Sequence, residues 1–123
     1  MGGEKQALTD HYTQPQNMGD LPEADLSVLV TNDACGDELY LYASVDGEEI
    51  TTVRFRAFGC APAVAAGSVL TEMIKGQKLE EIATLTRDDI DRALGGLPPL
   101  KQHCALLAED AIKALLKEAA QYS

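Results

Sequence analysis

The sequence predicts a single α+β domain over residues 1–123, in which a small antiparallel sheet of about three strands packs against several helices, including a long C-terminal helix. Three observations support this fold class. The length of 123 residues suits one domain with one core. Aromatic residues make up only 5% of the chain and Trp is absent, so the core must consist mainly of Leu, Val, Ile and Ala. Period-two apolar patterns before residue 60 change to helical spacing after it.

The N-terminal segment, residues 1–25, is expected to be an irregular and mobile arm. Residues 9–12 favour a single helical turn, after which Pro15, Gly19 and Pro22 interrupt any regular element. Beyond that turn, the segment is therefore not expected to contain regular secondary structure.

A β-hairpin is predicted at residues 39–45 and 51–58, which are rich in Val, Tyr, Phe and Leu. Asp46-Gly47 between the two runs is a turn signal. In the second run, apolar residues alternate with two arginines, so one face of the strand points to the core and the cations point outward. Residues 27–31 are expected to add a third strand.

Four helices are predicted in the second half of the chain. Residues 63–75 form the first, and Pro62 suits its opening turn. Residues 79–85 suggest a short helix, and residues 86–89 resemble a capping box that opens another. The last is a long amphipathic helix from Pro99 onward. Its expected apolar stripe consists of Leu100, Cys104, Leu107, Ala108, Ala111, Ile112, Leu115 and Ala119.

The charge of the chain argues against nucleic-acid binding. Twenty acidic residues against ten Lys and Arg give a net charge of −10, whereas nucleic-acid binding needs a basic face. An anionic membrane would repel the chain too, and no export or lipid signal is visible. We therefore expect a soluble, cytoplasmic protein. The charge is compatible with steering toward a basic partner surface and equally with a role in solubility alone.

Three cysteines lie in three separate contexts, and two of these contexts place a second ligand-type residue nearby. Asp37 follows Cys35 by two residues, Cys60 stands at the end of the predicted hairpin, and His103 precedes Cys104. An odd number of cysteines in a reducing compartment favours free or metal-bound thiols over disulfides. No CxxC pair is present, which argues for a site assembled by tertiary structure rather than a local zinc module. For each cysteine taken alone, a buried structural thiol is the simpler explanation.

The local context of each cysteine is also compatible with a ligand or a nucleophile. Cys35 and Asp37 are two residues apart, so their side chains can point to the same side of an extended chain. Cys60 at a strand-to-helix junction and Cys104 near a helix start lie where the helix dipole lowers a thiol pKa. His103 points about 100° away from Cys104 around the helix, so we expect the two to alternate as ligands rather than bind one ion together. Lys101 is expected to stabilise a Cys104 thiolate, to pair with Asp37, or to be a solvated surface lysine.

Several short motifs extend along nearly the whole chain. They are His11-Tyr12 with Pro15, Asn17 and Gly19; Ala34-Cys35-Gly36-Asp37; Phe58-Gly59-Cys60; Leu97-Pro98-Pro99-Leu100-Lys101; His103-Cys104; and Ala108-Glu109-Asp110-Ala111-Ile112-Lys113. In this order and spacing the motifs resemble those of the IscU/NifU-type iron–sulfur cluster assembly scaffolds. The absence of a long insertion between Cys60 and Cys104 favours the IscU branch over the SufU-like branch.

The resemblance implies a non-enzymatic scaffold that carries a transient [2Fe–2S] cluster built from ferrous iron and sulfur. It implies that Cys35, Cys60 and Cys104 bind the cluster and that Asp37 is a fourth ligand or makes the cluster labile. His103 would be an alternative ligand. Cys104 is our candidate for the first sulfur acceptor.

The implied partners are a cysteine desulfurase, recipient apoproteins such as ferredoxin, and a frataxin-like protein. A homodimer is also compatible with the resemblance. The segment made of Leu97, Pro98, Pro99, Leu100 and Lys101 resembles the recognition segment for an Hsp70-type chaperone, although it also suits a loop with a proline helix start. An alternative function is a sulfur carrier in which zinc at the same ligands tunes Cys104 as a persulfide acceptor. A purely structural zinc domain is disfavoured by the wide cysteine spacing.

Overall fold

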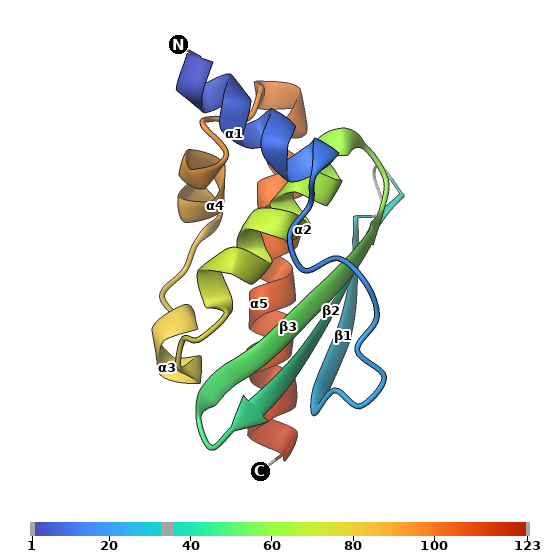
Figure 1. Cartoon of the computed structure of the whole chain (residues 1–123), viewed down its shortest axis with the longest axis vertical. Coiled ribbons are helices and arrows are strands. Elements are labelled where there is room, and N and C mark those ends of the chain that lie inside the picture. The colour runs from blue at the N-terminus through green and yellow to red at the C-terminus, as the bar shows by residue number, and fades with distance from the viewer. Residues whose placement is uncertain (1, 33–35, 123) are drawn as a thin grey trace.

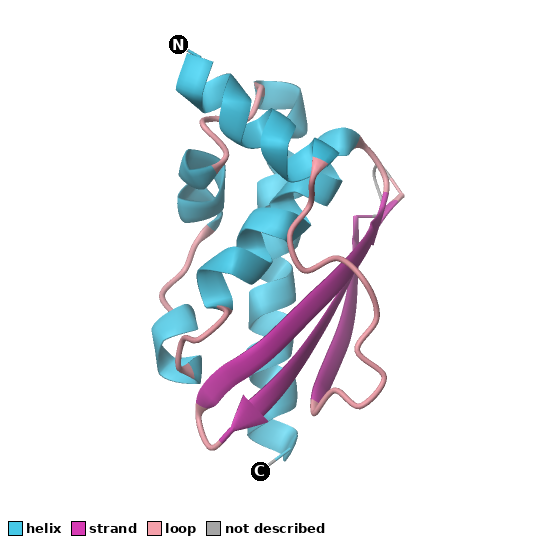
Figure 2. Cartoon of the chain, in the orientation of Figure 1, coloured by secondary structure: helices cyan, strands magenta, loops and turns pink. Residues whose placement is uncertain are grey.

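The computed structural model describes residues 2–32 and 36–122, with side chains from residue 8 to 121 within those ranges, and its centre is a three-stranded antiparallel sheet (Figures 1 and 2). The strands are β1 (Leu26–Asn32), β2 (Asp37–Asp46) and β3 (Glu49–Phe58), in the order β1-β2-β3. Alternate residues of β2 are buried, as the period-two pattern predicts. The predicted hairpin, third strand and fold class are therefore confirmed.

Two long helices cover one face of this sheet and form the core with it. Helix α2 (Ala61–Ile74) packs mainly on β3, and α5 (Gln102–Tyr122) packs mainly on β1 (Figure 1). Both helices begin at the end of the sheet where β3 finishes (Figure 1). Although α5 has 21 residues, no helix within the described ranges is long and apolar enough to cross a membrane.

Small residues on α2 allow it to lie close to the sheet. Ala63, Ala65 and Ala66 are buried, and Gly67 faces the ring of Phe55 on β3. A Cβ atom at Gly67 would overlap that ring, so the helix and the strand pack at a distance that only glycine permits here.

The two short helices lie between α2 and α5 in the chain. They are α3 (Leu79–Ile82) and α4 (Arg87–Ala93), and α4 begins with the predicted capping box. The Thr86 amide donates to Asp89 Oδ2 over 2.9 Å. A 3₁₀ turn at Pro99–Lys101 precedes α5.

The apolar stripe predicted for the last helix is wrong at its first member. Leu100 lies in the 3₁₀ turn rather than in α5 and is 86% exposed, because Pro98 and Pro99 keep this part of the chain outside the α-helix. The rest of the stripe is buried or packed against the core.

The N-terminal segment contains more regular structure than the single expected turn. Helix α1 (Gly2–Thr13) has 12 residues and packs on α2 (Figure 1). His11 Nδ1 lies 2.7 Å from Ser68 Oγ on α2. The residues that follow bond to the outer edge of β3, where Phe55 N donates to the Asn17 carbonyl and Gly19 N donates to the Phe55 carbonyl. These bonds cover part of a sheet edge that would otherwise be open to pairing with other chains.

The Gly67→Ala variant is expected to lower the free energy of unfolding by about 1–3 kcal/mol, the usual cost of forcing extra volume into a packed core. Urea or thermal unfolding followed by circular dichroism measures it. The cost should be smaller in a Phe55→Leu background, where the ring that Cβ overlaps is gone. Equal costs in both backgrounds would show that the Gly67–Phe55 contact does not set the helix position.

Candidate metal centre

Four ligand-type side chains meet at the end of the sheet where α2 and α5 begin. They come from Asp37, Cys60, His103 and Cys104, and one ligand atom of each lies within 4.8 Å of all the others. Asp37 is the first residue of β2, Cys60 is the N-cap of α2, and the other two lie in the first turn of α5. The structure thus brings together four of the five residues that the sequence singles out, and Cys35 lies outside the described residues.

Three short contacts link the four groups. Cys60 Sγ lies 3.6 Å from Cys104 Sγ and 3.8 Å from Asp37 Oδ2, to which its thiol donates. Asp37 Oδ2 also lies 3.2 Å from His103 Nε2. Two sulfurs, an imidazole nitrogen and a carboxylate oxygen form a ligand set that suits zinc or iron.

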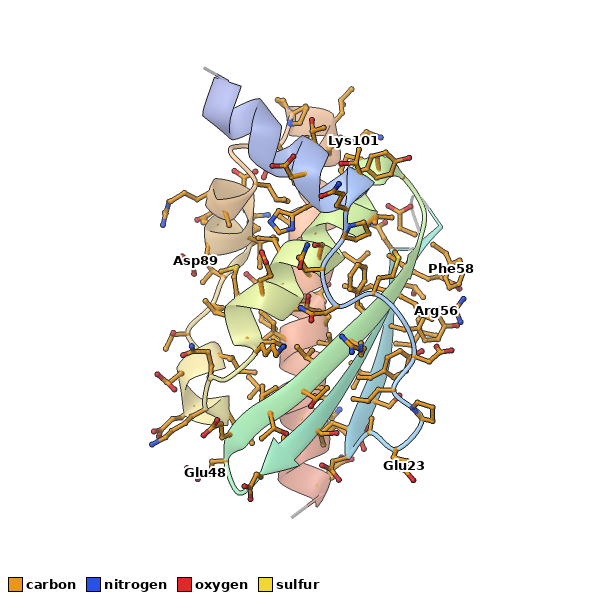
Figure 3. All side chains as sticks on the ribbon, viewed as in Figure 1. Glu23, Glu48, Arg56, Phe58, Asp89 and Lys101 are labelled. Atoms are coloured by element: carbon orange, nitrogen blue, oxygen red, sulfur yellow. The ribbon has the colours of Figure 1, made fainter. Side chains whose placement is uncertain are left out.

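The side chains of His103 and Cys104 reach the same site, although the two residues are adjacent on the helix. Their Cα atoms are turned apart on the helix, but the imidazole is long enough to return to the site and bond to Asp37. Lys101 does not pair with Asp37 in the described structure, since Asp37 is paired with His103. Lys101 lies near the start of α5 in Figure 3, and its charge only slightly favours the Cys104 thiolate.

The expected low pKa of Cys104 is also wrong. Cys104 is fully buried, and burial raises the pKa of its thiol far above the ordinary value. The hydrogen bond with Cys60 and the negative charge of Asp37 raise this pKa further, and the cation of Lys101 opposes them weakly. Loss of water therefore outweighs the helix dipole here. Burial therefore favours the neutral thiol of Cys104 over its thiolate.

Gly59 is a site residue that the sequence reasoning missed. Its φ of +155° is a conformation that residues with side chains rarely adopt, and a Cβ atom there would overlap the Asp37 carboxylate. The glycine thus lets the end of β3 pass directly over Asp37 and turn into α2. The signal was present in the sequence, since a glycine within a strand pattern often marks a close backbone approach.

The comparison with known families agrees with this geometry. The family described as NifU-like N terminal domain matches residues 3–122. The chain belongs to this family. A relative from Archaeoglobus fulgidus, named iron-sulfur cluster assembly scaffold protein IscU 1, is 44% identical over 85% of this chain and 68% of its own length. Another relative, from Drosophila melanogaster, is 43% identical over 90% of this chain and 74% of its own and is named iron-sulfur cluster assembly enzyme IscU.

The fold of this NifU-like domain is shared with solved structures. The crystal structure of a nitrogen-fixing NifU-like protein (N-terminal) from Brucella abortus superposes with a TM-score of 0.79, covering 96% of this chain and 94% of that one. Its sequence identity of 16% shows a common fold and no more. The relatives' names include both scaffold and enzyme, so they do not establish whether such proteins act catalytically.

The Gly59→Ala variant is expected to bind metal more weakly, because its Cβ displaces the Asp37 carboxylate. A loss of roughly 10- to 100-fold in affinity is the usual effect of disturbing groups that orient metal ligands. Titration with Co²⁺, followed by thiolate-to-cobalt absorption, measures this affinity.

Gly47→Ala is the matched control for Gly59→Ala. Gly47 also has a positive φ, +65°, but a Cβ there meets no atom within 4 Å, and the residue lies in the hairpin turn at the other end of the strands. Its Co²⁺ affinity should equal that of the wild type. Wild-type affinity in the Gly59→Ala variant would show that Asp37 placement does not depend on this glycine.

Proposed function

We propose that this protein is a scaffold on which an iron–sulfur cluster is assembled from iron and donated sulfur and then passed to recipient proteins. Membership of the NifU-like family and relatives named as iron–sulfur cluster assembly scaffolds support this function. The observation that carries it is the group of four ligand-type side chains, Asp37, Cys60, His103 and Cys104, at one end of the sheet. The iron–sulfur cluster is the cargo of the scaffold, which is built there and given away rather than retained.

We assign the cargo as a [2Fe–2S] cluster held by the thiolates of Cys35, Cys60 and Cys104. Two of these sulfurs already lie 3.6 Å apart. Asp37 is the fourth ligand in this proposal, and His103, which bonds to it over 3.2 Å, is the alternative. A carboxylate oxygen is a harder donor than a thiolate and a poorer match for iron–sulfur centres, so such a fourth ligand favours release of the cargo.

Sulfur delivery requires a partner, which we propose is a cysteine desulfurase carrying a persulfide. Cys104 remains our candidate for the acceptor, and because its side chain is fully buried, binding of the donor must first expose it. Cys60 is partly exposed and is reached more easily. In this proposal the protein itself is not an enzyme, because the persulfide is made by the partner.

Exposed apolar residues beside the site suit partner binding. Phe58, two residues before Cys60, is 48% exposed, and Figure 3 shows it projecting from the edge of the molecule with Arg56. Pro98, Pro99 and Leu100 are exposed just before α5. We propose that residues 97–101 bind an Hsp70-type chaperone, which would thereby act directly at the segment that leads into His103 and Cys104.

The alternative function, a zinc-tuned sulfur carrier, is favoured by one observation. Zinc prefers four ligands, and the site supplies four without Cys35. They come from Asp37, Cys60, His103 and Cys104. A purified protein containing zinc would be compatible with both functions, so the test must follow the cluster itself.

Anaerobic reconstitution of the wild-type protein with ferrous iron, cysteine and a cysteine desulfurase is expected to give the visible absorption and circular dichroism bands of a [2Fe–2S] cluster. On addition of apo-ferredoxin, those bands should be replaced by the bands of holo-ferredoxin. If no chromophore forms while persulfide accumulates on Cys104, the protein is a sulfur carrier and not a scaffold.

The Asp37→Ala variant is expected to assemble the cluster and to transfer it to apo-ferredoxin several-fold more slowly, because its labile oxygen ligand is lost. Transfer is measured by circular dichroism after reconstitution. Asp46→Ala is the control, since Asp46 is exposed at the opposite end of β2 and its loss should leave the transfer rate unchanged. Equal rates for Asp37→Ala and the wild type would remove the labile-ligand role.

A further inference from the structure

We propose that Cys60 and Cys104 act as a dithiol that reduces the donated sulfur to sulfide within the site, by forming a disulfide with each other. This inference rests on the proposed function, which delivers sulfur to the site as a persulfide. Both thiols are free, and their Sγ atoms lie 3.6 Å apart. A persulfide on either thiol would therefore have the other thiol beside its inner sulfur.

The chemical step is balanced without an added reductant. A donated sulfur on Cys104 Sγ is at the oxidation level of sulfane sulfur, and the Cys60 sulfur attacks that Sγ as the Cys60 thiol gives up its proton. The bond between that Sγ and the terminal sulfur breaks, a bond between the two Sγ atoms forms, and the terminal sulfur leaves as hydrosulfide. The two cysteines lose two electrons in total, and the released sulfur gains them.

The proton released by the attacking thiol has an acceptor in the structure. The Cys60 thiol donates to Asp37 Oδ2, 3.8 Å away, and the same oxygen lies 3.2 Å from His103 Nε2. These groups can pass a proton to the departing sulfide. Asp37 and His103 thus serve the redox step as well as metal binding.

The short distance between the two sulfurs favours a disulfide between them. A disulfide bond is about 2.05 Å long, so the sulfurs must approach by little more than one atomic radius. Cys60 and Cys104 open α2 and α5, two helices that pack against each other, and their side chains already point into one space. Sulfide would be released beside the candidate iron ligands, where cluster assembly uses it.

The product is a disulfide, so the protein must be reduced before it can bind a cluster through these cysteines. A dithiol protein or a low-molecular-weight thiol returns the two cysteines to the reduced state by thiol–disulfide exchange. Sulfide release and cysteine regeneration are thereby separate steps, and only the second needs an external electron donor.

The test uses the full chain, freed of metal by a chelator, reduced, and treated anaerobically with glutathione persulfide. After rapid desalting, released sulfide and the intact protein mass are followed over time. The wild type is expected to release one sulfide per disulfide formed and to reach a mass lower than that of the reduced protein by two hydrogens. Peptide mapping should show Cys60 joined to Cys104. Reduced protein incubated without persulfide should form no disulfide.

Cys60→Ser and Cys104→Ser variants, checked for folding by circular dichroism, should keep their persulfide and lose sulfide release. Sulfide release by both variants at the wild-type rate, or a mapped disulfide that includes Cys35, would overturn the proposal. The mapping of the wild type decides the matter even if a variant does not fold. Reconstitution of the wild type with iron and inorganic sulfide does not need the reduction of a persulfide. If a cluster forms in that reconstitution but no disulfide forms in the persulfide experiment, the inference is rejected and the scaffold function stands.

Discussion

The position of the candidate site depends on how closely α2 packs against β3. Gly67 faces the ring of Phe55, and the alanines around it are buried, so the helix lies close to the sheet at this point. The start of the helix, with Cys60, is thereby held against the end of the strand. From there its sulfur reaches Cys104 on α5. Larger side chains on α2 would separate the two thiols.

Much of the fold follows from local patterns in the sequence. The period-two strands, the turn near Gly47 and the capping box at Thr86 are all signals that act over a few residues, and the structure confirms them. Helix α1 has no strong apolar face, and contacts with α2 such as the one between His11 and Ser68 help to hold it. Such long-range contacts are not visible in local sequence, which explains why a longer helix was not predicted there.

The chemistry of the site was predictable by residue type but not by environment. The ligand types and their tertiary assembly followed from the scattered Cys, Asp and His residues. The pKa of Cys104 did not, because the helix dipole is a local effect whereas burial depends on how α5 packs. The close passage of Gly59 over Asp37 likewise depends on the register of β2 and β3, which pairs Glu38 with Phe58.

The polar groups of the candidate site are satisfied by one another, and this bears on how the proposed scaffold would release its cargo. Asp37 is only 4% exposed, yet it bonds to His103 and accepts from Cys60, and within the described residues no buried side-chain nitrogen or oxygen lacks a partner. A site whose polar groups had no partners would pay a desolvation penalty whenever it was empty. In the proposed scaffold, loss of the cargo would restore the Asp37–His103 pair, so the same two residues would favour both binding and release. In the proposed scaffold, cluster binding therefore competes with a stable arrangement in which Asp37 and His103 bond to each other. This competition suits a protein that must give its product away.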